Sequence, residues 1–209
     1  MEKLTVERLG VGQMGTNCYL VMNRDTKELL VIDPGAQADR IRLKVSDMGG
    51  KPAAVLLTHG HYDHIGAAKQ VCEMYGISCY ALKEEEALLA SETMNLSGMF
   101  GHPMTLKPDQ WLQDGQELTM AGRSLRVLAT PGHTAGGASY YFPQEGVLFS
   151  GDTLFCGSVG RSDFPTGSAA ILVRSIREKL LVLPDETAVY PGHESDTTIG
   201  YEKKYNPFL

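Results

Sequence analysis

The segment AAVLLTHGHYDH, residues 53–64, places three histidines and an aspartate directly after an uninterrupted apolar run. A short continuous apolar run is typical of a strand that is buried on both faces, as in a sheet covered by helices. His59 and His61 are two residues apart, so an extended turn can point both rings the same way. The segment therefore predicts a buried strand whose end carries a cluster of imidazoles.

Histidine is scarce in this chain, and its positions follow a pattern. Of the six histidines among 209 residues, five lie at the ends of apolar segments, in the strings THGHYDH, ATPGH and VYPGH. Asp152 follows the apolar string VLFSG in the same manner. One such histidine alone would indicate a core residue, whereas the joint pattern indicates a metal site held at strand ends. His102 lies outside the pattern, and we expect it to be an ordinary loop residue.

The donor types limit the metal. Imidazole and carboxylate ligands without thiolate suit zinc, iron or manganese, and zinc is the first expectation. The candidate ligands are His59, His61, Asp63, His64, His133, Asp152 and His193. Seven donors exceed the four that one tetrahedral ion takes, so two divalent ions that share a carboxylate fit the number better.

The chain divides into two similar halves within a single domain, residues 1–209. Strand-like and helical segments alternate over about 1–90 and again over about 110–209, with an irregular connection at 91–110. This alternation in two halves predicts an α/β (α+β) fold in which two mixed sheets pack together with helices outside. We expect a helix over 37–48, because apolar residues recur there at helical spacing.

Other segments give more local predictions. The glycine-rich residues 156–167 predict a loop, and a helix is expected near 168–182. The acidic run KEEE at 83–86 predicts the solvated start of a helix.

Charge and hydropathy exclude several functions. The net charge of −6 and the isoelectric point near 5.5 argue against nucleic acid as a partner. No apolar stretch approaches the ~18 residues of a membrane span. The N-terminal MEKLTVERLG lacks the apolar core of a signal peptide, so we expect a cytoplasmic protein. The oligomeric state is left open.

The motifs taken together resemble a known family. THGHYDH, TPGHT, SGDTLF and YPGHE, preceded by NCYLV and VIDPG, resemble the metallo-β-lactamase superfamily over nearly the whole chain. The resemblance implies a four-layer αββα sandwich with metals at one edge of its two sheets. GDTLFCGSVGRSDFPTG and GYEKKYNPFL are similar to the glyoxalase II-like hydrolases, especially their short bacterial members.

The resemblance implies two sets of three ligands and one bridging carboxylate. The first set is His59, His61 and His133, and the second set is Asp63, His64 and His193. Asp152 would bridge the two ions, at a position where many zinc β-lactamases carry a cysteine.

The implied reaction is attack of a metal-activated hydroxide on a small-molecule thioester such as S-lactoylglutathione. Asp63 would orient the hydroxide as well as bind metal. Arg161 is a candidate contact for an acidic substrate, with an ion pair to Asp163 as the structural alternative. Tyr62 and Phe155 are candidates for the mouth of the cleft, with ordinary packing as the alternative. We expect no C-terminal glutathione-binding helical region, which leaves the thiol carrier open.

Two other reactions stay open within the same fold. Persulfide dioxygenases resemble the chain too, and they would use one iron bound by His59, His133 and Asp152. A broad-specificity esterase or lactonase is the other alternative. Asp33, in the string VIDPG, is a candidate to support the ligands or to cap a turn.

Overall fold

A computed structural model describes residues 4–209, and its first sheet is built from residues 4–112. The strands of this sheet, which are neighbours in chain order, are β1 (Leu4–Val11), β2 (Thr16–Asn23), β3 (Glu28–Ile32), β4 (Lys51–Leu56), β5 (Ser78–Leu82) and β6 (Gln110–Leu112). β1 to β3 pair antiparallel, and β3 to β6 pair parallel. Parallel neighbours need crossover connections. Helices α1 (Ala38–Asp47) and α3 (Ala68–Tyr75) lie in the first two of these crossovers, and the short α2 (Tyr62–Ile65) precedes α3.

The second sheet has the order β14-β13-β10-β9-β8-β7. Its strands are β7 (Glu117–Met120), β8 (Arg123–Ala129), β9 (Ala138–Phe142), β10 (Val147–Gly151), β13 (Ala188–Pro191) and β14 (Thr197–Thr198). β10 and β13 are parallel, whereas the other neighbours are antiparallel. The connection from β10 to β13 contains a hairpin, β11 (Leu154–Phe155) and β12 (Ser158–Val159), then α5 (Ala169–Ser175) and a π-helical segment, η2 (Ile176–Leu180). Helix α6 (Ile199–Tyr205) follows β14.

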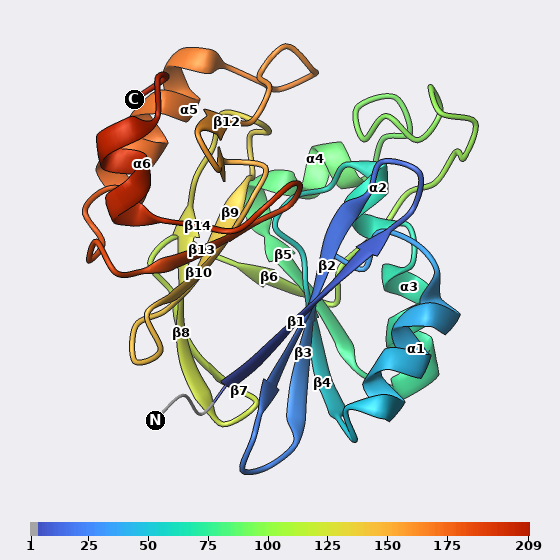
Figure 1. The fold of residues 1–209 in the computed structure, drawn as a ribbon. Coiled ribbons are helices and arrows are strands. Elements are labelled where there is room, and N and C mark those ends of the chain that lie inside the picture. The colour runs from blue at the N-terminus through green and yellow to red at the C-terminus, as the bar shows by residue number, and fades with distance from the viewer. Residues whose placement is uncertain (1–3) are drawn as a thin grey trace.

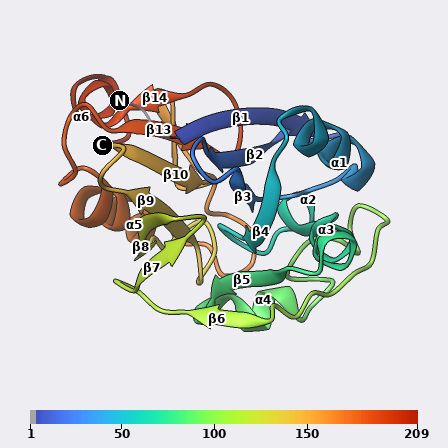
Figure 2. The same ribbon diagram turned by 90° about the horizontal axis from the view of Figure 1, so that it is seen from below.

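The two sheets pack face to face, with helices on both outer faces. Figure 2 shows α1 and α3 outside the first sheet and α5 and α6 outside the second. In β3, Leu30 and Ile32 point into the apolar cluster between the sheets, while Leu29 and Val31 point into the cluster under α1 and α3. Side chains alternate along a strand, so a strand covered on both faces needs an uninterrupted apolar run. The predicted four-layer αββα architecture is confirmed (Figure 1).

Several local predictions are confirmed, and two are wrong. The helix expected over 37–48 is α1, and 91–109 forms turns and irregular structure without a strand. The segment 156–167 is not entirely a loop, because it contains β12. This strand pairs with β11 over two residues and forms a small hairpin. The acidic run at 83–86 is not fully solvated, because Glu85 is buried.

Residues 83–89 form η1 (Lys83–Glu85) and α4 (Glu86–Leu89). Residues 1–3, which begin the N-terminal segment considered for a signal peptide, lie outside the described residues. Within residues 4–209, every helix is too short or too polar to span a lipid bilayer.

Candidate metal centre

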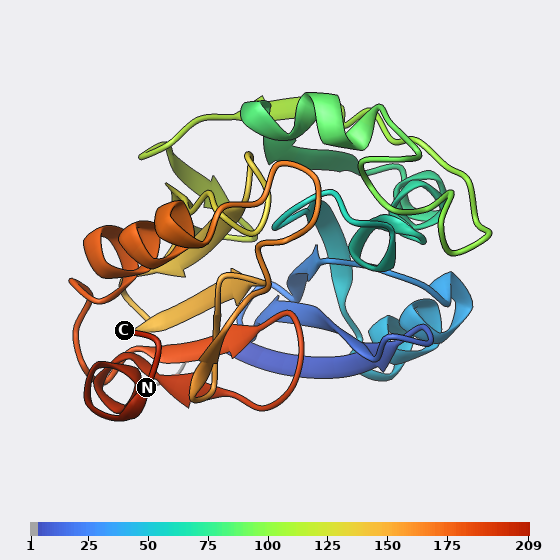
Figure 3. The ribbon, with the colours of Figure 1, turned by 90° about the horizontal axis from the view of Figure 1, so that it is seen from above.

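The candidate ligands meet at one edge of the two sheets because the strands that carry them end there. β8, β10 and β13 run in the same direction, since β9 is antiparallel to both β8 and β10 and β13 is parallel to β10. Their carboxyl ends therefore share an edge. The end of β4 joins them through a hydrogen bond from the backbone N–H of Ala138 to the Thr58 carbonyl, at 2.7 Å. Figure 3 looks onto this edge, and the loop between β12 and α5 crosses it.

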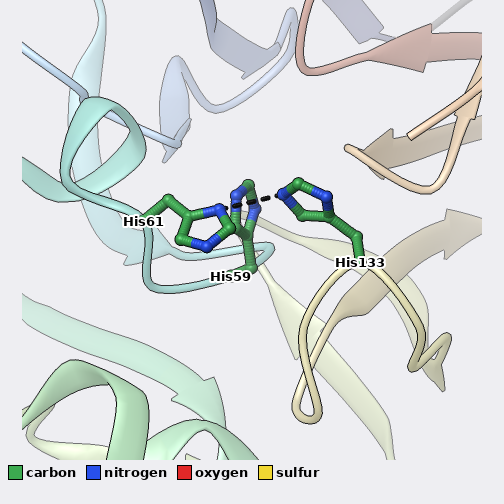
Figure 4. Close-up of side chains that lie close together, drawn as sticks. All are labelled: His59, His61 and His133. Carbon is green, nitrogen blue, oxygen red and sulfur yellow. Dashed lines mark hydrogen bonds between the residues drawn. The ribbon is translucent and has the colours of Figure 1, made fainter. Parts of the chain in front are cut away.

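Three histidines form the first group. His59 and His61 follow β4, His133 follows β8, and the potential ligand atoms of all three lie within 4.8 Å of one another. His61 Nδ1 and His133 Nε2 are 2.9 Å apart (Figure 4). His133 Nδ1–H donates to the Arg161 carbonyl at 2.7 Å, which directs Nε2 toward the group. His59 Nε2 is buried without a hydrogen-bond partner among the described residues.

The protonation of this group suits a metal ion. Burial and the neighbouring imidazoles lower the pKa of His59 well below its usual value, and they lower the pKa of His61 to about 3. Both rings are therefore neutral near pH 7 and present free lone pairs. Buried polar atoms without partners are uncommon, so the unpartnered His59 Nε2 needs an explanation. A cation bound by the three rings supplies one.

Asp63, His64 and His193 form the second group. Asp63 and His64 lie on α2, and His193 follows β13. His193 Nε2 lies 3.3 Å from Asp63 Oδ2 and 3.4 Å from His64 Nε2. Burial alone would lower the pKa of His64, but the carboxylates of Asp63, Asp152 and Asp33 raise it to about 10. A cation held by His64 Nε2, Asp63 and Asp152 would take the place of the Nε2 proton, because both satisfy the same negative charge.

Asp152 lies between the two groups. Its Oδ2 is 3.6 Å from His133 Nε2 in the first group and 3.5 Å from His193 Nε2 in the second. Its Oδ1 is 3.4 Å from His64 Nε2 and is a buried atom without a hydrogen-bond partner in the described part of the chain. A carboxylate with one oxygen unpartnered, placed between two sets of nitrogens, fits a ligand shared by two cations.

Asp33 supports the ligands. It is 1% exposed and accepts hydrogen bonds from the backbone N–H and the hydroxyl of Thr58, at 2.7 and 2.5 Å. Its Oδ2 also accepts from His64 Nδ1 at 2.9 Å, which directs His64 Nε2 toward the second group. Both carboxylate oxygens are thus engaged, so Asp33 is placed to orient His64 and would leave its free Nε2 to a metal.

Thr16 and Asn17, at the start of β2, contact the second group, and neither was predicted from the sequence. The Thr16 hydroxyl donates to Asp63 Oδ2 at 2.8 Å. The Asn17 side chain donates to the carbonyls of Pro191 and Glu194, each at 3.0 Å, and so braces the turn that carries His193. Asn17 begins the string NCYLV, but nothing in the sequence shows which distant residues the two side chains contact.

A cavity of about 550 Å³ opens beside the ligands. Its walls include the three residues predicted to meet a substrate, Tyr62, Phe155 and Arg161. The Tyr62 ring stacks on Phe100, with centroids 4.7 Å apart. Arg161 pairs with Asp163, the structural alternative given for it, through two hydrogen bonds of 2.8 and 2.7 Å. His102 is exposed in the irregular connection, as expected.

Comparison with known proteins identifies the family. A family model described as the metallo-beta-lactamase superfamily matches residues 11–193, a stretch that contains all seven candidate ligands. The chain belongs to the metallo-β-lactamase superfamily. The chain is also similar to the hydroxyacylglutathione hydrolase GloC of Haemophilus influenzae. The two are 38% identical over 209 residues, covering 99% of this chain and 98% of that protein.

Solved structures of the superfamily share the fold. The crystal structure of the BLEG-1 B3 metallo-beta-lactamase is 40% identical, has a TM-score of 0.93, and covers 98% of this chain and 99% of that chain. The crystal structure of TTHA1623 in a di-iron-bound form is 35% identical, with a TM-score of 0.87 over 97% of this chain and 100% of that chain. A protein of this fold is therefore known in a di-iron-bound form, and the two ligand groups here would allow two ions as well.

Proposed function

We propose that the protein is a cytoplasmic hydrolase that uses two divalent cations, zinc before iron or manganese, to cleave a small thioester of the S-lactoylglutathione type. The observation that carries the proposal is the position of Asp152 between two separate ligand groups. A single-metal enzyme needs only one such group. The similarity to a protein named hydroxyacylglutathione hydrolase supports a thioester as the substrate.

Each group would hold one cation. His59, His61 and His133 would bind the first, Asp63, His64 and His193 the second, and Asp152 both. Divalent cations bound in this way lower the pKa of a water molecule and polarise a carbonyl oxygen. The three carboxylates, including Asp33, offset most of the positive charge of two such ions.

Asp63 would orient the attacking water. Burial opposes ionisation of its carboxyl, but His64 and the hydrogen bonds from His193 and Thr16 hold the pKa of Asp63 below its usual range. It is therefore an ionised acceptor at neutral pH and a weak base. Its Oδ2 already accepts from Thr16, and the carboxylate lines the cavity, where it can accept a hydrogen bond from water.

The walls of the cavity suit a thioester with an anionic carrier. Arg161 lines the cavity with its guanidinium 3.8 Å from the Phe164 ring centroid, and this cation is placed to meet a substrate carboxylate. A thiol has a pKa of ~8.5, so the leaving thiolate needs no proton donor. An amine leaving group needs one, which favours a thioester over an amide.

A mono-iron dioxygenase is the second candidate. The set it would use, His59, His133 and Asp152, is also present, with His133 Nε2 3.6 Å from Asp152 Oδ2. That reaction gives no role to Asp63, His64 and His193, whose potential ligand atoms gather within 4.8 Å of one another. We therefore place hydrolysis first.

Substrate assays with the purified, metal-loaded protein distinguish these reactions. Release of thiol from S-lactoylglutathione, lost in His133→Ala, is the expected result. A β-lactam serves as the comparison substrate, since BLEG-1 carries the name of a β-lactamase. Oxygen uptake on glutathione persulfide without thioester hydrolysis would replace the proposal with the dioxygenase.

A further inference from the structure

Glu85 is a buried carboxylate that the proposed reaction does not use. It ends η1, between β5 and α4, and is 1% exposed, whereas its neighbours Glu84 and Glu86 are exposed. Burying a carboxylate is costly unless hydrogen bonds compensate for the lost water. Burial does raise the pKa of Glu85, and the backbone N–H groups of Gly60 and Gly136 oppose that rise. The partners that compensate for this burial indicate what the side chain does.

The two oxygens of Glu85 join the two loops that carry the three-histidine group. Oε1 accepts from the backbone N–H of Gly60 at 2.8 Å, and Oε2 accepts from the backbone N–H of Gly136 at 2.7 Å. Gly60 lies between His59 and His61 on the loop after β4, in the first sheet. Gly136 follows three residues after His133, on the loop between β8 and β9 in the second sheet. One carboxylate therefore links both halves of the group.

Close packing makes this link rigid. A Cβ at Gly136 would lie 2.2 Å from the Glu85 backbone nitrogen, and a Cβ at Gly60 would lie 2.8 Å from the side chains of Leu88 and Leu89. Only glycine allows both loops to approach η1 and α4 so closely. Leu88 and Leu89 are themselves buried, so this short helical segment has little freedom to move.

The second ligand group is held by different residues. Asp63 is bonded by Thr16, His64 by Asp33, and the turn of His193 by Asn17. None of the hydrogen bonds of Glu85 in the described residues reaches this group. In the described part of the chain, Glu85 therefore contacts only the loops of the three-histidine group, whereas Asp33, which bonds both Thr58 beside His59 and His64, lies between the two groups.

We propose that Glu85 is a positioning residue of the three-histidine site, where it fixes the distance between the His59–His61 loop and the His133 loop and so sets the affinity of that site for a divalent cation. The proposal depends on metal binding by these histidines and not on the identity of the substrate. Supporting residues of this kind typically change metal affinity by ~10–100-fold when they are replaced.

Cobalt titration of the metal-free protein tests the proposal. Glu85→Gln keeps the shape of the side chain, but its amide NH₂ would face one of the two backbone N–H donors. Glu86→Gln is the matched control, because Glu86 is the next residue and its exposed carboxylate pairs with Lys83. His133→Ala and His193→Ala identify which absorption band and which binding step belong to each site.

One cobalt site is the one that His133→Ala abolishes, and we expect Glu85→Gln to lower its affinity for cobalt by ~10–100-fold. The affinity of the other site, which His193→Ala abolishes, should stay unchanged. Glu86→Gln should match the parent protein. Equal affinities in Glu85→Gln and the parent, or equal weakening of both sites, would overturn the proposal. Glu85→Asp is the second variant, and if neither yields a folded metal-free protein by circular dichroism, Glu85 supports the whole fold and the specific role is rejected.

Discussion

Replacing Gly192 by alanine tests how tightly Asp152 is held between the two ligand groups. A Cβ at Gly192 would lie 2.1 Å from Asp152 Oδ1 and 2.8 Å from His64 Cε1. Both distances are shorter than 3.0 Å, which Cβ atoms in proteins essentially never show. The turn cannot easily retreat, because the Gly192 N–H donates to the Gly151 carbonyl at 2.8 Å. The carboxylate must therefore shift by about 1 Å to restore normal contact.

A displacement of this size at a reacting centre costs on the order of 100-fold in rate. We expect Gly192→Ala to lower kcat/KM for thioester hydrolysis by about 100-fold, which corresponds to about 3 kcal/mol of transition-state stabilisation. The fold, measured by circular dichroism, should persist. Gly10→Ala is the control, since Gly10 is exposed in β1 and its added Cβ meets nothing within 4 Å. A Gly192→Ala enzyme with the metal content and rate of the parent would refute the reasoning.

Three further substitutions test the surroundings of the site. Thr16→Val removes the hydroxyl that donates to Asp63 at 2.8 Å. We expect this variant to lose one metal ion at a chelator concentration ~10-fold lower than the parent protein requires. Equal retention of metal in the two proteins would show that the hydroxyl is dispensable. Glu202→Gln weakens the buried carboxylate that accepts from the Gly157 N–H at 3.0 Å, and urea denaturation should show the free energy of unfolding lowered by ~1–3 kcal/mol. An unchanged urea midpoint would contradict this. Arg161→Ala should change stability by less than ~1 kcal/mol, because its side chain is 57% exposed, while raising KM for an anionic thioester. An unchanged KM would remove Arg161 from the substrate site.

The fold and the meeting of the ligands could be predicted because both follow from local patterns. Continuous apolar runs such as that of β4 require cover on both faces, which predicts sheets between helices. Ligands placed where such strands end share an edge once the strands run in the same direction, as β8, β10 and β13 do. The scarcity of histidine then made coincidence a poor explanation for His59, His133 and His193.

The residues that hold the ligands could not be predicted, because their contacts join distant parts of the chain. Thr16 is 47 residues from Asp63, and Glu85 is 51 residues from Gly136. The acidic run around Glu85 has the composition of a solvated helix start, and only the packing of η1 against both loops shows that one of its three carboxylates is buried. The β11–β12 hairpin was missed because two-residue strands leave no alternation to detect.

Counting metal ions in the parent protein and in His193→Ala, after loading both with zinc and removing loosely bound ions, tests the two-metal site most directly. His193 belongs to the second ligand group and has no part in a site made of His59, His133 and Asp152. We expect about two ions per chain in the parent and about one in the variant. One ion per chain in both proteins would contradict a two-metal centre.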